Sequence, residues 1–302
     1  MSPLGELGLV GAGGEPVDLR RTLASHGVAT LPPQRLDEEA WTLETTLPLP
    51  RGRARTVRVR AGRRGHAAVE LVGDAGARDR GRLLATVRHM LRLDDDLSGF
   101  YAAVAGDEAL AWVAAAGAGR MLRSPTVFED VVKTVCTTNC SWALTTTMTT
   151  ALVAHLGASA PDGRRAFPSP EAMAAADESF YREVARSGYR APYLRALAAS
   201  VASGEVDLEA LADPGLTDDE AAARLLALPG IGPYGAAHVM LTSLGRYSRL
   251  VLDSWTRPTY ARLAGRKAKD ATIERRFRRY GEWAGLAFWL TLTRDWVAET
   301  DG

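Results

Sequence analysis

One carboxylate, Asp253, is the residue that the sequence best places to do chemistry. The apolar run Leu250-Val251-Leu252 ends on it, and Ser254-Trp255 follows. A lone carboxylate can stabilise positive charge that develops on a substrate, and it can orient or deprotonate an attacking water molecule. The alternative role is structural, because an Asp here also suits the N-cap of a following helix.

A turn rich in glycine and proline, Pro229-Gly230-Ile231-Gly232-Pro233, lies upstream of Asp253. Pro229 cannot continue a helix, whereas Pro233 suits the first turn of a new one. Gly230 and Gly232 can take positive φ, and without side chains they let a phosphate approach their main-chain N–H groups. Such a loop is suited to gripping a phosphodiester without reading base sequence.

The residues on both sides of this turn favour helix. Thr217-Asp218-Asp219-Glu220 has the spacing of a capping box, and a run rich in alanine and leucine follows it. We predict a helix-hairpin-helix over residues 217–246 and a loop over 250–256 that carries the carboxylate. Taken alone, the turn also fits an ordinary corner between two helices of a bundle.

The chain as a whole divides into two regions that differ in the periodicity of their apolar residues. Residues 1–18 are Gly-rich and are predicted to be loose. Segments with alternating apolar residues follow and predict an antiparallel sheet with one wet face, at 41–47, 56–60 and 67–72. From about residue 79 the period becomes helical. The predicted fold class is α+β, with a small β-rich N-terminal domain (1–78) and a predominantly helical domain (79–302).

The composition is that of a soluble globular protein. The chain has 302 residues, of which 46% are hydrophobic and 24% charged, and a net charge of +1. This balance argues against nucleic-acid binding by bulk charge but allows one basic face. Because the sequence has neither an apolar run of membrane-spanning length nor the basic start of a signal peptide, we expect a cytoplasmic protein with no membrane association.

Two cysteines, Cys136 and Cys140, are too few for a four-cysteine iron–sulfur cluster. Their spacing within an apolar segment indicates core packing.

The hairpin and Asp253 together resemble the helix-hairpin-helix–Gly/Pro–Asp superfamily of DNA base-excision glycosylases. Three further stretches, 124–142, 187–194 and 280–290, resemble the 8-oxoguanine glycosylase branch, in the order found there. The resemblance covers roughly residues 80–295. It implies a monomer that binds double-stranded DNA, flips a damaged base and cleaves its N-glycosidic bond. When bound to DNA the protein would be associated with the nucleoid.

The resemblance implies roles for individual residues. Asp253 would be catalytic, and Gly230 and Gly232 would contact DNA. Asn139 would fill the gap left by the flipped nucleotide, Tyr189 would wedge beside it, and Arg190 would hydrogen-bond the orphaned base. The alternatives are that Asn139 caps a helix, and that Tyr189 and Arg190 snorkel at a helix start. Three main-chain carbonyls match those that hold a Na⁺ or K⁺ ion in the family, at Leu226, Leu228 and Ile231.

One departure from the family bears on the reaction. Bifunctional relatives carry a lysine in the second hairpin helix, where it forms a Schiff base with the sugar; here that position is Tyr234. No lysine occurs between residues 134 and 266, so the usual lyase chemistry is missing. We therefore expect a monofunctional glycosylase that uses water and needs no organic cofactor. Val251 also replaces a proline common two residues before the Asp.

Substrate choice rests on the residues expected to line the base pocket. These are mostly aromatic: Tyr234, His238, Trp255, Phe288 and Trp289. Cationic alkylated bases stack well on aromatic faces, so an alkylated base is the predicted substrate. His238 also fits the core.

The sequence leaves two alternatives to a glycosylase for alkylated bases. The first is an 8-oxoguanine glycosylase without lyase activity, although Phe288 and Leu144 replace a Gln and an Arg of that branch. The second is a non-catalytic protein that binds damaged DNA.

Overall fold

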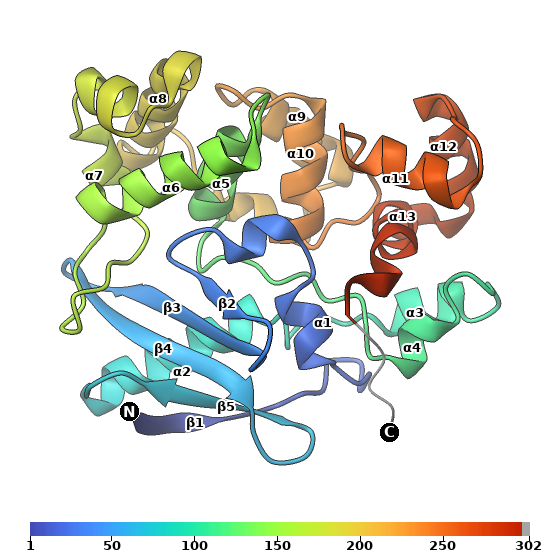
Figure 1. The fold of residues 1–302 in the computed structure, drawn as a ribbon, viewed down its shortest axis with the longest axis horizontal. Helices are drawn as coiled ribbons and strands as arrows, with labels where there is room; N and C mark the ends of the chain where they lie inside the picture. The colour runs from blue at the N-terminus through green and yellow to red at the C-terminus, as the bar shows by residue number, and fades with distance from the viewer. Residues whose placement is uncertain (298–302) are drawn as a thin grey trace.

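A five-stranded antiparallel sheet forms the first layer of the computed structural model, which describes residues 1–297. The strand order is β1-β5-β4-β3-β2 (Figure 1). The strands are β1 (Ser2–Gly8), β2 (Arg35–Asp37), β3 (Thr42–Leu49), β4 (Arg53–Ala61) and β5 (His66–Leu71). The predicted antiparallel sheet is confirmed, with alternating burial along β5 from Ala67 to Leu71.

The prediction that residues 1–18 are loose is wrong for β1. This strand pairs with β5 along the sheet edge, and the register shifts between Pro3 and Gly5. An edge strand tolerates proline and a bulge, so the Pro/Gly content that suggested a loop is compatible with pairing.

The helix α2 (Ala77–Met90) packs on the sheet through Leu83, Val87 and Met90, in one apolar cluster with Leu43 and Val57. The predicted division at residues 78 and 79 marks the change of periodicity, but packing joins α2 to the sheet. Periodicity reports the type of an element and not the layer against which it packs.

The rest of the chain is mostly helical, as predicted. Before the hairpin come α1 (Leu19–Leu23), η1 (Gly27–Thr30), α3 (Ser98–Val104), α4 (Trp112–Ala115), α5 (Val127–Thr137), α6 (Trp142–Leu156), α7 (Pro170–Ala174), η2 (Phe180–Val184), η3 (Gly188–Arg190), α8 (Ala191–Ala202) and η4 (Glu209–Ala212). The hairpin and the remainder are α9 (Asp218–Leu226), α10 (Pro233–Val239), η5 (Met240–Leu244), α11 (Thr256–Leu263), α12 (Asp270–Phe277), η6 (Arg278–Trp283), α13 (Ala284–Thr293) and η7 (Arg294–Trp296).

The helix α10 lies where two apolar cores meet. Val239 belongs to the core built with α5, α6 and α8, whereas Ala237 belongs to the core built with α3, α11, α12 and α13. In Figure 1, α5–α8 lie on one side of α10 and α11–α13 on the other. The second hairpin helix is therefore fixed from both sides, which suits an element that must hold a reactive loop in place.

Buried polar side chains join the two regions. Arg92, after α2, donates to the carbonyls of Thr242 and Ser243 in η5, at 2.7 and 2.6 Å. Gln34 accepts from Lys133 Nζ of α5 at 2.6 Å. These bonds tie the N-terminal layer to the hairpin and to α5.

No helix within residues 1–297 combines the length and the apolarity needed to cross a membrane.

Candidate active site

The predicted hairpin is present, with α9 and α10 as its two helices. Thr217 and Glu220 form both hydrogen bonds of the capping box, and Pro233 occupies the first turn of α10. Gly230 has φ +80°, but Gly232 has φ −104°, so only the first glycine needs the left-handed region. A Cβ atom on Gly230 would lie 3.0 Å from the Tyr193 ring, so this glycine is also required by contact.

Asp253 caps the turn that opens α11. One carboxylate oxygen, Oδ1, accepts from the N–H groups of Trp255 and Thr256 at 2.8 and 2.6 Å, and Thr256 Oγ1 accepts from the Asp253 N–H at 2.8 Å. Within residues 1–297 no group donates to the other oxygen, Oδ2. The capping alternative is therefore correct as far as Oδ1 is concerned. This capping leaves Oδ2 available, because the Asp253 side chain is only half-buried and lies beside a cavity.

A cavity of about 870 Å³ brings the predicted residues together from four parts of the chain. Its walls are the tip after α5, the start of α8 with the turn before it, the hairpin, and the loop that carries Asp253. The side chains and main-chain segments concerned are Thr137–Cys140, Tyr189, Tyr193, Gly230, Gly232–Gly235, Leu252–Ser254 and Arg257. The carboxylate thus faces the same space as the turn glycines and the tip residue Asn139.

Asn139 occupies the exposed tip between α5 and α6. It has φ +46°, and its Nδ2 donates to the Tyr189 hydroxyl at 3.4 Å. Ser141, not Asn139, caps α6 by accepting from the Leu144 N–H. The helix-cap alternative for Asn139 is therefore wrong. Cys140 follows it half-buried at the tip, whereas Cys136 is in the core.

Arg190 differs from the expectation that it faces the orphaned base. Its side chain is buried, with the residue 3% exposed, and it donates to the main-chain carbonyl of Thr138. Its guanidinium also stacks on the Tyr189 ring at 4.4 Å, while that ring stays exposed. In this conformation Arg190 supports the tip at Thr138 and the ring of Tyr189, and its guanidinium does not face solvent.

Tyr234 lines the cavity, and His238 lies behind it. The Tyr234 hydroxyl is 3.3 Å from Thr137 Oγ1, and burial raises the pKa of this tyrosine. Burial lowers the pKa of His238 to about 3, so its imidazole is neutral. His238 Nδ1 is 3.4 Å from Thr134 Oγ1. Of the two alternatives for His238, the interior position is the one observed.

The predicted aromatic pocket is divided. Phe288 is fully buried against Tyr260 and Phe277, so its assignment to the base pocket is wrong. Trp289, one residue on, is also buried, but its ring lies 5.6 Å from that of the exposed Trp255. A shift of one position around a helix moves a side chain by about 100°, and the uniformly apolar sequence of α13 gives no sign of which face is buried.

Trp296 was missed by sequence reasoning. Its ring is 5.4 Å from Trp255 and 6.0 Å from Trp289. Trp255 and Trp296 are 38% and 41% exposed, which is high for tryptophan. The three rings form an aromatic cluster beside the loop of Asp253. Only tertiary packing brings Trp296 there, so no local sequence signal could have found it.

Lysine is absent from the residues that line the cavity. Lys133 is buried in an ion pair with Glu129 at 2.7 Å. Lys267 and Lys269 are exposed on the connection between α11 and α12.

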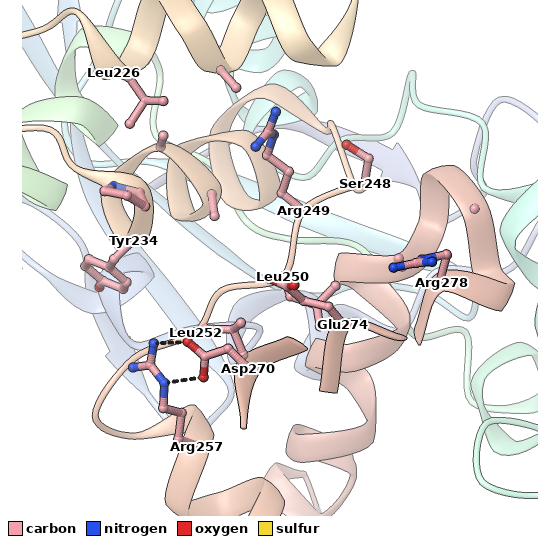
Figure 2. A pocket seen from close by; sticks show the side chains of 16 residues that line it. Leu226, Tyr234, Ser248, Arg249, Leu250, Leu252, Arg257, Asp270, Glu274 and Arg278 are labelled. Carbon is pink, nitrogen blue, oxygen red and sulfur yellow. Dashed lines mark hydrogen bonds and ion pairs between the residues drawn. The ribbon is translucent and has the colours of Figure 1, made fainter. Parts of the chain in front are cut away.

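A second cavity, of about 580 Å³, lies between the hairpin helices and α12 (Figure 2). It shares Pro233, Tyr234, Leu252 and Arg257 with the first. Arg257 forms a two-pronged pair with Asp270, with both N···O distances at 2.8 Å. Arg249 and Arg278 also line it, so its walls carry charges of both signs. Sequence reasoning did not anticipate this cavity.

Of the three carbonyl oxygens predicted to hold a cation, those of Leu226 and Ile231 are free of main-chain hydrogen bonds within residues 1–297 and that of Leu228 is not. The Leu228 carbonyl accepts from the Ile231 N–H at 3.2 Å. Within the described chain, no main-chain N–H donates to the carbonyl of Leu226 or of Ile231. Free carbonyl oxygens are suitable ligands for Na⁺ or K⁺.

Comparison with known proteins places this geometry among DNA repair proteins. The family model described as HhH-GPD superfamily base excision DNA repair protein matches residues 132–284. N-glycosylase/DNA lyase OGG1 of Arabidopsis thaliana is 33% identical over 184 residues, which are 56% of this chain and 49% of that protein. The chain thus matches about half the length of this relative.

Two solved structures share the fold over nearly the whole chain. The 3-methyladenine DNA glycosylase from Archaeoglobus fulgidus has a TM-score of 0.75 at 22% identity, covering 97% of this chain and 99% of that one. The 8-oxoguanine glycosylase/lyase of Clostridium acetobutylicum has a TM-score of 0.71 at 18% identity, covering 93% of each chain.

Proposed function

The chain belongs to the HhH-GPD superfamily of base excision DNA repair proteins, and from that premise we propose that it is a monofunctional DNA glycosylase for alkylated bases. The observation that carries the proposal is the half-free carboxylate of Asp253, which faces one cavity with the turn glycines and the Asn139 tip. A protein that only bound DNA would need this carboxylate as a cap for the turn that opens α11, and Oδ1 alone meets that need.

The chemistry follows from what each group can do. Double-stranded DNA with a damaged base would lie along the hairpin, with main-chain N–H groups near Gly230 and Gly232 toward a phosphate. Asn139 and Tyr189 would occupy the gap left by the flipped nucleotide. As the base leaves, positive charge develops on the sugar. Asp253 would stabilise that charge and orient the water that attacks C1′.

The absence of lyase activity is proposed from Tyr234. Its phenol lines the cavity at the position where bifunctional relatives carry lysine, and a phenol cannot form a Schiff base. Lys133, the nearest lysine before it in sequence, is buried and paired with Glu129. The product would therefore be an intact strand with an abasic site.

An alkylated base is supported by the aromatic cluster Trp255, Trp289 and Trp296. The exposed rings of Trp255 and Trp296 attract cationic rings, and an N-alkylated purine carries positive charge. Such bases also leave readily, so a site that offers one carboxylate and little leaving-group assistance suffices. At the hairpin, Leu226, Leu228 and Ile231 would hold a monovalent cation that favours the approach of a phosphate.

The test is a panel of duplexes, carrying N-alkylated purines or 8-oxoguanine, scored for base release and for strand cleavage. We expect release of alkylated bases, no cleavage without added alkali, and no covalent adduct when borohydride is present. A borohydride-trapped adduct would contradict the monofunctional mechanism. Release of 8-oxoguanine alone would identify the substrate as that of the Clostridium enzyme of the same fold. Binding without any release would leave a damage-binding protein.

A further inference from the structure

Two buried histidines follow Tyr234 into the protein. The ring of His238 lies 5.7 Å from that of Tyr234, and the ring of His26 lies 5.8 Å beyond it, nearly perpendicular. His26 comes from the N-terminal region, in the loop before η1, whereas His238 lies on α10. Both residues are less than 5% exposed. The order from the cavity inward is therefore Tyr234, His238, His26.

The loop that carries His26 also touches the aromatic cluster. The carbonyl of Ser25 accepts from Trp289 Nε1 at 2.8 Å, and Trp289 packs on Trp255, two residues after Asp253. The segment Ser25–His26 thus packs on Trp289 through the Ser25 carbonyl and on His238 of the hairpin helix α10 through the His26 ring. Neither Ser25 nor His26 lines the cavity of Asp253, so a base turned past Tyr234 would reach this segment only after the His238 ring moves aside.

Hydrogen bonding fixes the tautomer of His26. Its Nε2 is 2.6 Å from the carbonyl oxygen of Leu122. A carbonyl can only accept, so Nε2 carries the proton and Nδ1 presents a lone pair. Nδ1 is buried and has no hydrogen-bond partner among the described residues. A buried acceptor without a partner is disfavoured, so this atom is suited to a donor that arrives from outside the chain.

We propose that His26 is a specificity-determining residue, whose Nδ1 accepts a hydrogen bond from an N–H group on the purine edge remote from the sugar. This inference rests on the proposed function. The Nδ1 acceptor would select purines with an amino group at C6 over purines with an oxygen at C6, because its lone pair repels a carbonyl oxygen.

The charge state of the pair agrees with a cationic substrate. Burial lowers the pKa of His26 to about 4 and that of His238 to about 3, so both rings are neutral at physiological pH. Neutral rings do not repel an N-alkylated purine, whereas two imidazolium ions would.

Two isosteric substitutions separate the hydrogen bonds of His26. In His26→Gln the side-chain amide can replace Nε2 as donor to Leu122, but no acceptor remains at the position of Nδ1. In His26→Asn an acceptor remains near Nδ1, and the bond to Leu122 is lost. DNA methylated at random supplies 3-methyladenine and 3-methylguanine together, with an amino group and an oxygen at C6 respectively. The measured quantity is the ratio of their single-turnover release rates.

We expect the wild type to release 3-methyladenine faster than 3-methylguanine, and His26→Gln to reduce that ratio about three- to tenfold with little change in melting temperature. We expect His26→Asn to keep the ratio and to lower the melting temperature. An unchanged ratio in folded His26→Gln would overturn the inference while the proposed function stands. If the wild type released neither base, the proposed function would fail, and the inference with it.

Discussion

At the scale of single residues, the structure separates side chains that face the cavity from side chains that support it. Tyr189 is exposed at the cavity wall, whereas Arg190 beside it is buried and bonded to Thr138. Adjacent residues in a sequence can thus have opposite roles. The resemblance that assigned both to DNA contact could not distinguish them, because it carries no information on side-chain direction.

Arg190→Ala tests this division. Its removal leaves the Thr138 carbonyl without its charged donor, so we expect the free energy of unfolding to fall by about 2 kcal/mol, and base release to slow as the tip loosens. Tyr189→Ala is the matched variant, and it should weaken DNA binding with little loss of stability. Urea unfolding and release opposite each of the four bases provide the readouts. A stable Arg190→Ala with altered opposite-base preference would show that Arg190 reads the orphaned base instead.

At the scale of elements, the hairpin was predictable because its signals are local. The capping box at Thr217, the prolines and Gly230 each act within a few residues, and each takes its expected place. β1 was missed because its pairing with β5 joins residues far apart in the chain. The same reason hid Trp296 and His26, whose partners come from other elements.

Gly230→Ala tests the hairpin geometry. The new Cβ would meet Tyr193 at 3.0 Å while φ stays positive, so we expect a loss of about 1–3 kcal/mol in stability and weaker DNA binding. Gly232→Ala is the control, since its φ is −104° and nothing lies within 4 Å of its added Cβ. Its stability should remain within about 0.5 kcal/mol of wild type. Equal effects of the two substitutions on stability would refute the assigned turn geometry.

At the scale of the whole molecule, the N-terminal layer and the helical region behave as one structure. Arg92, Gln34 and Trp289 form buried hydrogen bonds between them. The division at residue 78, read from periodicity, is thus a boundary between types of element and not between independent units. The two buried histidines lie at the same junction, one from each side.

Those histidines make stability depend on pH. Folding lowers the pKa of His26 to about 4 and of His238 to about 3, from an ordinary value of 6.5. Between pH 6.5 and about 4 the unfolded chain therefore binds protons that the folded chain does not, and the free energy of unfolding falls as pH falls. Urea unfolding from pH 7 to pH 4.5 should show this decline. The decline should be shallower in His26→Gln, and an identical slope in that variant would contradict the buried neutral state of His26.

In the proposed reaction the Asp253 carboxylate drives base release, and one substitution isolates its charge. Asp253→Asn retains an oxygen that can accept from the N–H groups of Trp255 and Thr256, so the loop should keep its shape. Asp18→Asn is the control, because Asp18 also caps a helix, at Arg21, away from the cavity.

The measurement is single-turnover release of methylated bases, with DNA affinity determined in parallel. We expect Asp253→Asn to bind DNA normally and to release bases about 10²–10⁴-fold more slowly, while Asp18→Asn acts as the wild type. Release by Asp253→Asn at the wild-type rate would contradict the catalytic role of Asp253.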